Sequence, residues 1–290
     1  MRTRLRRLGF GLATVLGIAP RGFFIPYGHA GSAAPADYPA LRPLFEAAET
    51  NCAGVLRAVE THRADLLAIV ACDGPARFDQ DWFPRLDAAA AYAIVRLMEP
   101  RLIVEIGSGH STRFLARAVD DGGIGADIVC IDPAPRASLA GLKLRHEKTV
   151  LAAADASHFQ RLQAGDILFI DSSHIAMPGT DVDRLFLDIL PRLARGVLVH
   201  VHDIFLPDGY PAEWGWRGYN EQLLAGALIQ GGGYEIVFAS HYVVTERAPL
   251  MAGGVVPRLP LVSGARETSL WLRKTSPAAA FTTPKVKPTA

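Results

Sequence analysis

From residue 102 onward, the sequence alternates short apolar segments with segments of helical periodicity. The apolar segments have the length of strands and contain few polar residues, as strands buried on both faces do. Strands of that kind, separated by helices, form a mainly parallel sheet with helices packed on both sides. The pattern predicts an α/β fold over residues 101–274. The expected strands are 102–106, 128–131, 149–152, 167–170, 197–201, 234–239 and 270–272, and the expected helices between them are 112–119, 182–193 and 221–229.

The segments outside this alternation differ in character. Residues 38–100 carry apolar side chains at helical spacing, which predicts amphipathic helices within 38–72 and an alanine-rich helix over 87–98. We interpret this part as an N-terminal helical extension of the sheet domain. Residues 275–290 contain three prolines and two lysines. Because such a segment cannot bury much apolar surface, we predict a disordered tail.

Residues 1–37 form a basic, apolar arm. Four arginines among the first seven residues precede the apolar run 8–20, an order that is typical of a signal peptide. As a helix, this run is only about 20 Å long, against roughly 30 Å of membrane hydrocarbon. The small residues at 31–34 leave cleavage open, but we favour an arm that docks on its own protein or on an anionic membrane surface. The expected location is cytoplasmic, with peripheral membrane contact.

The composition excludes several classes of protein. Half of the 290 residues are hydrophobic, so the chain has enough apolar material for a sizeable core and is not intrinsically disordered. A net charge of +1 gives no general attraction to phosphates, and no nucleic-acid partner is expected. Three cysteines are too few for a disulfide framework or a cysteine zinc site, and they fit a reducing compartment.

A glycine-rich turn follows the first predicted strand. Gly107 and Gly109 have no Cβ, so the backbone can turn sharply there and approach a ligand closely. Thr112 stands where a dinucleotide-binding fingerprint has its third glycine, which disfavours a nicotinamide cofactor. Glu105 precedes the turn. Its carboxylate would repel a pyrophosphate but suits a ligand that carries positive charge.

Two further acids are placed to bind a nucleoside. Asp132 ends the second predicted strand, where a carboxylate accepts hydrogen bonds from the hydroxyls of a ribose. Asp155 follows the third predicted strand, where its carboxylate could accept from an adenine amino group. The alternatives are an acid at a helix start for Asp132 and an exposed loop acid for Asp155.

Glu105, Gly107, Gly109 and Asp132 together resemble the cofactor site of class I S-adenosylmethionine-dependent methyltransferases. The motifs FIDSSH and HVHDIFLP further down the chain resemble one bacterial branch of that superfamily. The resemblance implies a Rossmann-like, seven-stranded sheet whose last strand is antiparallel, and S-adenosylmethionine as the cofactor. It also implies that Glu105 and the glycine turn hold the amino-acid part of the cofactor, and that Asp132 holds its ribose.

Four side chains with useful chemistry, Asp171, His174, His202 and Asp203, follow two strands that we expect to be neighbours. They should converge on one cleft, because neighbouring parallel strands end at the same edge of a sheet. Methyl transfer to a hydroxyl requires oriented reactants and removal of a proton. A histidine suits that task near neutral pH. Our first choice is His202 and our second His174, with Asp171 or Asp203 holding the imidazole in the useful tautomer. We expect His200 to face the other side of the strand and to lie in the core.

The same cluster admits a metal-binding interpretation. Asp171 stands where catechol-type methyltransferases have an acid that holds Mg²⁺, and His202-Asp203 stands where they have Asp-Asn. Histidine is a poor Mg²⁺ ligand, so Asp171, His202 and Asp203 would suit a softer ion such as Mn²⁺ or Zn²⁺. One alternative function for a metal site of this kind is that of a metal-dependent hydroxylase or hydrolase on the same fold. A separate alternative is a non-catalytic, methyltransferase-like binding protein. In a purely structural reading, the histidines cap strands and bond to the backbone.

The favoured prediction is an enzyme that methylates an oxygen of a small molecule or glycan, with a nitrogen as the second choice of acceptor atom. The loop 208–219 carries four large aromatic residues, which indicate either a lid over the acceptor or local packing. The N-terminal helices are candidates for the interface of a homodimer.

Overall fold

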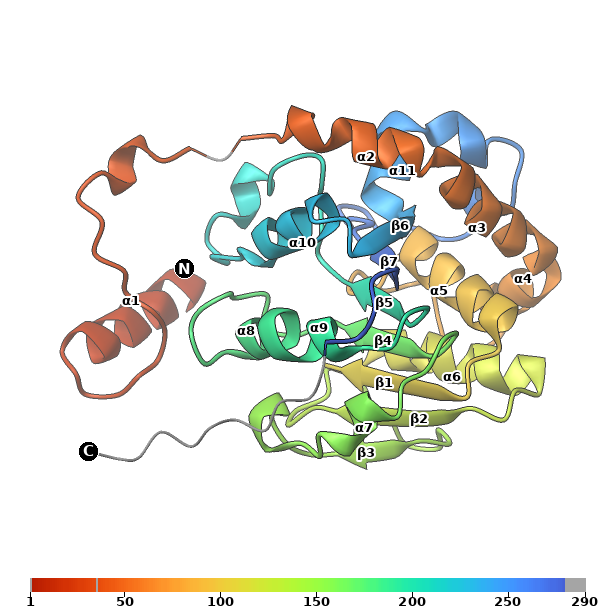
Figure 1. The fold of residues 1–290 in the computed structure, drawn as a ribbon, viewed down its shortest axis with the longest axis horizontal. Coiled ribbons are helices and arrows are strands. Elements are labelled where there is room, and N and C mark those ends of the chain that lie inside the picture. Colours follow the sequence, from red (N-terminus) through yellow and green to blue (C-terminus); the bar gives the residue numbers. More distant parts are fainter. Residues whose placement is uncertain (1, 35, 280–290) are drawn as a thin grey trace. The chain divides into compact units, whose positions relative to one another are not determined.

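The structure is a computed structural model that describes residues 2–34 and 36–279. The chain divides into two units, Met1–Pro35 and Ala36–Ala290. The second unit contains the sheet and every residue that the sequence predicts for the functional site (Figure 1).

The first unit consists of a helix, a short 3₁₀ turn and connecting chain. Helix α1 (Arg2–Val15) is followed by the 3₁₀ turn η1 (Ala30–Ser32). The apolar side chains Leu5, Leu8 and Leu12 of α1 are exposed. Within the described residues, no helix combines the length and the hydropathy needed to cross a bilayer.

The second unit is built on one seven-stranded sheet (Figure 1). Its strands are β1 (Leu102–Ile106), β2 (Asp127–Ile131), β3 (Arg145–Glu147), β4 (Ile167–Ile170), β5 (Leu198–Val201), β6 (Tyr234–Ala239) and β7 (Leu270–Lys274). The strand order is β3-β2-β1-β4-β5-β7-β6, and β7 runs antiparallel to both of its neighbours while the other pairs are parallel. The predicted Rossmann-like sheet with an antiparallel last strand is confirmed.

Helices cover both faces of the sheet, and each face has its own apolar core. On one face lie α3 (Glu49–Thr61), α4 (Arg63–Ala71), α5 (Arg85–Met98) and α6 (His110–Gly122). On the other lie α2 (Arg42–Ala47), α7 (Ser157–Gln160), α8 (Asp181–Arg184), α9 (Leu190–Arg192) and α10 (Glu221–Gln230). Successive strand residues point to opposite faces, so Ile103 packs in the first core and Val104 in the second.

The third predicted strand is wrong in position. Strand β3 is Arg145–Glu147, and the predicted segment 149–152 is instead a loop that leads into a 3₁₀ turn at Leu151–Ala153. β3 pairs only with β2 and lies at the edge of the sheet. An edge strand exposes its side chains, so this one is polar and lacks the apolar run by which a central strand is recognised.

The predicted helix over 182–193 is interrupted. It consists of α8, a π-helical turn at Leu185–Ile189 and the short α9. Pro191 lies inside α9 and has no backbone N–H to donate to the preceding turn, which accounts for the irregular hydrogen bonding there. Two α-helices were not predicted at all: the short α7 (Ser157–Gln160), which precedes β4, and α11 (Ser240–Glu246), which directly follows β6.

The C-terminal segment begins as ordered chain. The Thr275 N–H donates to the carbonyl oxygen of Gly233, and the Ala279 N–H donates to that of Pro191. The rest of the predicted disordered tail, residues 280–290, lies outside the described residues.

Candidate functional site

The glycine turn lies where the carboxyl ends of β1 and β4 meet. Gly107 has φ +78°, and a Cβ at this position would lie 1.8 Å from the carbonyl oxygen of Asp171. A Cβ on Gly109 would lie 3.4 Å from the backbone nitrogen of Ala137. The two glycines therefore allow close approach between backbone segments of the chain itself.

Glu105 lies beneath this turn and is fully buried. Its carboxylate accepts hydrogen bonds from the hydroxyls of Ser111 and Thr112, both at 2.6 Å, and from the Cys130 thiol at 3.2 Å. Burial raises the pKa of Glu105 to about 7, although these bonds act in the opposite direction. In this structure Glu105 fixes the start of α6. Its role toward the amino-acid part of the cofactor stays a prediction.

The two other predicted cofactor acids differ in position. Asp132 is nearly buried at the end of β2. Its Oδ2 accepts from the N–H and hydroxyl of Ser108, and its Oδ1 accepts from the Ala134 N–H. Asp155 is exposed and accepts from the Ser157 N–H at 2.9 Å, a bond that lowers its pKa. Asp132 therefore stands beside the glycine turn, whereas Asp155 occupies an exposed loop at the start of α7.

Two unpartnered polar atoms flank the turn. His110 Nδ1 and Ser172 Oγ are buried and have no hydrogen-bond partner among the described residues. His110 directly follows Gly109, and the Ser172 backbone lies 3.7 Å from where a Cβ on Gly107 would be. Buried polar groups are normally paired, so these atoms fit a polar ligand at this edge of the sheet.

The structure brings the four predicted catalytic side chains together, and we refer to Asp171, His174, His202 and Asp203 as the acid–histidine cluster. His174 Nε2 lies 3.2 Å from Asp171 Oδ1 and 3.5 Å from Asp203 Oδ2. His202 Nδ1 lies 3.8 Å from Asp171 Oδ1 and 3.5 Å from Asp203 Oδ1. The two strands β4 and β5 are neighbours and parallel, as predicted, which explains the convergence.

Two members of the cluster have an unusual backbone conformation. His174 has φ 59° and Asp203 has φ 57°, in the left-handed region that non-glycine residues rarely adopt. Among the described residues, Glu99 at the end of α5 is the third non-glycine case. Such conformations cost roughly 1–3 kcal/mol each and concentrate at functional sites. Here they turn both side chains toward the same point.

Each histidine of the cluster also contacts a buried acid that was not predicted as a site residue. Glu221 Oε2 lies 2.9 Å from His174 Nδ1, and Asp87 Oδ2 lies 3.4 Å from His202 Nε2; both acids are fully buried. Asp87 belongs to α5 and was expected only as part of an alanine-rich helix. One sequence feature could have identified it. Asp87 is the single acidic residue of α5, and the eight residues that follow it carry no charge.

The protonation of the cluster differs from the expectation of a histidine that titrates near neutral pH. Burial alone would lower the pKa of His202, but Asp171, Asp87 and Asp203 outweigh it and raise the pKa to about 9. Against the same effect of burial, Asp171 and Glu221 raise the pKa of His174 well above its usual value. Both imidazoles are therefore cationic at neutral pH. The two histidines hold the pKa of Asp171 well below its usual range, although burial acts to raise it.

His200 lies on the same side of β5 as His202, not on the opposite side as expected. Residues two positions apart in a strand share a face, and the two rings lie 5.7 Å apart. His200 is fully buried, stacks on Phe169 at 3.7 Å and pairs its Nε2 with the Ser269 hydroxyl at 2.9 Å. Burial and the nearby charge of His202 lower its pKa well below the usual value, so His200 is neutral.

A cavity of about 120 Å³ adjoins the acid–histidine cluster, and all four members of the cluster line it. Trp82, Trp214 and Tyr219 contribute aromatic walls, and Arg217 contributes a cation. The sequence predicted either a lid over the acceptor or local packing for the loop 208–219. Two of its four large aromatic residues, Trp214 and Tyr219, line the cavity. Tyr210 instead packs against Phe205.

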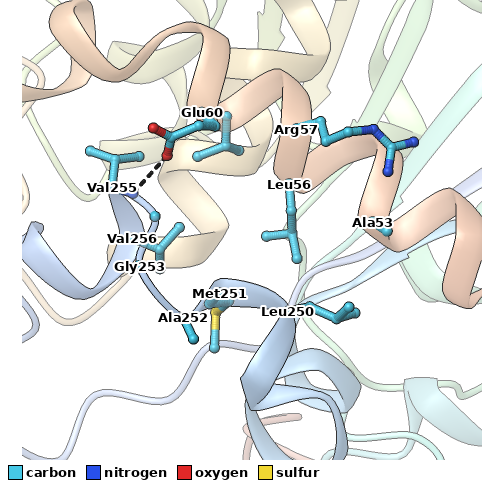
Figure 2. A pocket seen from close by; sticks show the side chains of 12 residues that line it. Ala53, Leu56, Arg57, Glu60, Leu250, Met251, Ala252, Gly253, Val255 and Val256 are labelled. Carbon is cyan, nitrogen blue, oxygen red and sulfur yellow. Dashed lines mark hydrogen bonds between the residues drawn. The ribbon is translucent and has the colours of Figure 1, made fainter.

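A second cavity, of about 450 Å³, lies between α3 and the segment 250–256. Figure 2 shows Leu56 reaching from α3 toward this segment, and Glu60 bonded to the Val255 N–H. The two cavities share no lining residue. Arg57 and Glu60 are the ionisable residues of this lining, so the cavity holds no acid–histidine pair for proton transfer.

The geometry does not fit the divalent-metal site considered for Asp171, His202 and Asp203. In the described part of the chain, no group of three or more His, Cys, Asp or Glu side chains is arranged to hold a metal ion. The metal interpretation finds no support in this arrangement.

The segment with the site's chemistry matches a known family. Residues 104–204, about a third of the chain, match the model of a family described as a methyltransferase domain. The matched segment contains the glycine turn, Asp132 and the whole acid–histidine cluster, on a seven-stranded sheet with an antiparallel strand β7, as the resemblance implied. The resemblance to class I S-adenosylmethionine-dependent methyltransferases is confirmed. The matched segment places the cluster at the carboxyl edge of the sheet.

Three solved structures align with the chain at low identity. An SAH-bound methyltransferase from Podospora anserina is 16% identical with a TM-score of 0.42, and the alignment covers 88% of this chain and 100% of that one. A putative O-methyltransferase from Klebsiella pneumoniae is 15% identical with a TM-score of 0.37, over 77% and 90% of the chains. The branched-chain polyamine synthase of Thermus thermophilus is 16% identical with a TM-score of 0.42, over 78% and 66%. The comparison with curated proteins finds no match.

Proposed function

We propose that the protein transfers the methyl group of S-adenosylmethionine to a hydroxyl oxygen of a small molecule. The observation that carries this proposal is the Asp87–His202 pair. Asp87 holds Nε2 of the imidazole inside the protein, and Nδ1 lies on the side of the cavity carboxylates. An imidazole held in this way supports an acceptor that must lose a proton, as a hydroxyl does.

The carboxyl ends of β1 and β2 would hold the cofactor. Asp132 would accept from its ribose, and the unpartnered His110 Nδ1 and Ser172 Oγ would bind its polar groups beside the glycine turn. Glu105 would act indirectly, by fixing the start of α6 under that turn. When bound, S-adenosylmethionine supplies an electrophilic methyl group.

His202 Nδ1 is the proposed proton acceptor. In the neutral imidazole, Nε2–H donates to Asp87 and Nδ1 is left with a free lone pair. The imidazolium that forms after proton transfer is stabilised by Asp171 and Asp203 on the Nδ1 side. The same carboxylates raise the pKa of His202 to about 9, so the basic form increases as the pH rises toward that value.

Calorimetric titration of the metal-stripped protein with S-adenosylhomocysteine tests the cofactor site. Asp132→Asn should weaken binding roughly tenfold or more, because hydrogen bonds to a charged group contribute about 1.5–3 kcal/mol. Asp155→Asn is the matched control, since this acid is exposed, and should bind like the wild type. Absence of binding to the folded wild type, or equal binding by Asp132→Asn, would contradict the proposal.

A further inference from the structure

Arg217 lines the cavity beside the acid–histidine cluster. Its side chain contacts aromatic rings and one hydroxyl. Its guanidinium carbon lies 3.9 Å from the centre of the Trp214 ring, and Nη1 donates to the Tyr219 hydroxyl at 3.2 Å. The Nε atom is buried and has no hydrogen-bond partner within the described residues. A buried N–H without a partner is unfavourable, so a ligand that accepts from Nε would stabilise this arrangement.

The free edge of the guanidinium favours one kind of acceptor. Trp214 covers one face and Tyr219 engages Nη1, which leaves the edge formed by Nε and Nη2. This edge binds a carboxylate through two parallel N–H···O bonds. A neutral carbonyl or hydroxyl offers a single oxygen and no opposite charge, so it would be bound more weakly.

The cavity restricts the remainder of the ligand. Arg217 and His202 line the same space of about 120 Å³, and Trp82, Trp214 and Tyr219 form aromatic walls around it. A protein cavity of about 150 Å³ holds one benzene ring. The space is thus on the scale of a single ring, and aromatic walls suit a planar one.

On the basis of the proposed function, we infer that the acceptor is a small hydroxylated aromatic carboxylate. Its carboxylate binds the Nε edge of Arg217, and its hydroxyl lies at His202 Nδ1. In the reaction, an O–CH₃ bond forms, the S–CH₃ bond of the sulfonium breaks with its electron pair remaining on sulfur, and the hydroxyl proton passes to His202. The carboxylate is chemically unchanged and serves recognition.

S-adenosylmethionine also carries a carboxylate, so the test must show whether Arg217 binds the carboxylate of the acceptor or that of the cofactor. We would measure binding of 2-, 3- and 4-hydroxybenzoate and of the matching hydroxybenzamides by calorimetry, with and without S-adenosylhomocysteine. At least one hydroxybenzoate should bind roughly tenfold more tightly than its amide. Arg217→Gln should remove this difference and leave the affinity for S-adenosylhomocysteine within about twofold of wild type.

Arg266→Gln is the matched control. Arg266 also borders the cavity, but its guanidinium is already paired with Glu213. The acid–amide difference should survive this substitution. Thermal melting and circular dichroism would confirm that each variant is folded. Arg217→Lys offers a second variant, which keeps the charge, lacks the planar fork and should lose most of the difference.

The inference would be overturned by equal binding of acid and amide by the wild type, by no binding of any isomer, or by a preference for the acid that survives Arg217→Gln. Loss of S-adenosylhomocysteine affinity in Arg217→Gln would assign the guanidinium to the cofactor's carboxylate and overturn it as well. If the wild type does not bind S-adenosylhomocysteine, the proposed function fails. The titrations without this compound then still decide whether Arg217 binds an aromatic carboxylate.

Discussion

Asp87 Oδ2 lies 3.4 Å from His202 Nε2, although the two residues are 115 positions apart in the sequence. The same carboxylate accepts from the backbone N–H groups of Thr268 and Ser269, at 2.9 and 3.0 Å, and from the Ser240 hydroxyl. One buried anion thus joins the start of α5 to the ends of β5 and β6 and to the segment that enters β7. Asp87 is therefore both a positioning residue for His202 and a structural centre.

Asp87→Asn should destabilise the protein strongly. In the wild type, each carboxylate oxygen of Asp87 accepts a backbone N–H. The asparagine amide would place an NH₂ group, which cannot accept, against one of these N–H groups. His202 would also lose the negative charge that balances its own positive charge. Removing one member of a buried charged network costs about 3–5 kcal/mol, and we expect a decrease of this order in the free energy of unfolding measured in urea. Asp120→Asn is the control, since its ion pair with Lys143 is exposed and should contribute less than about 1 kcal/mol. Equal stability of the two variants would exclude the structural role.

The two cationic histidines predict a loss of stability in mild alkali. A group whose pKa is raised by folding stabilises the protein fully below its unfolded pKa, near 6.5, and this contribution is lost as the pH rises through its folded pKa. For His202 the window runs from about 6.5 to about 9, and the pKa of His174 is raised as well. The free energy of unfolding should fall over this window by up to about 1.4 kcal/mol per pH unit for each group.

Glu221→Gln tests which contact produces this slope. Without the nearest carboxylate, His174 should titrate at lower pH, and the decrease between pH 6.5 and 9 should become smaller. Urea denaturation at several pH values, together with NMR titration of the imidazole, measures both quantities. A wild-type stability that is constant or rises over this range would contradict the cationic assignment.

The parts of the fold that could be predicted are those in which burial determines the sequence. β1 and β4 are apolar because both faces are covered, and their predicted bounds agree with the structure. β3 was misplaced because an edge strand has no such requirement. The predicted orientation of His200 was wrong for another reason. We expected it to face away from His202, but residues two positions apart in a strand face the same side.

The site could be predicted only in part, because sequence proximity to a strand end does not show where a side chain points. Asp171 and His202 do converge, as parallel neighbouring strands require. The inward orientation of Glu105, and the contact between Asp87 and His202, depend on how α5 and α6 pack on the sheet. No local pattern records that packing.

Gly107→Ala should be far more damaging than an alanine at a glycine of similar conformation. At Gly107 the new Cβ would lie 1.8 Å from the Asp171 carbonyl oxygen, a distance that requires β1 and β4 to move apart. Gly141 has φ +81° and nothing within 4 Å of the same position, so Gly141→Ala measures the cost of the backbone conformation alone, about 1–2 kcal/mol. We expect Gly107→Ala to exceed that cost by several-fold or to yield no folded protein. Similar unfolding midpoints for the two variants would show that the close approach is relaxed in solution.

The proposed base predicts the pH dependence of methyl transfer. Only neutral His202 accepts a proton, and its pKa is about 9, so kcat/KM for a hydroxyl acceptor should rise about tenfold per pH unit below that value and level off above it. Asp87→Asn, where it remains folded, removes a carboxylate that raises this pKa and should move the profile to lower pH. His202→Gln should abolish the rise while leaving binding of S-adenosylhomocysteine intact, since His202 is not among the residues proposed to hold the cofactor. A wild-type profile that is flat between pH 7 and 9, or one unchanged in His202→Gln, would assign the proton transfer to another group.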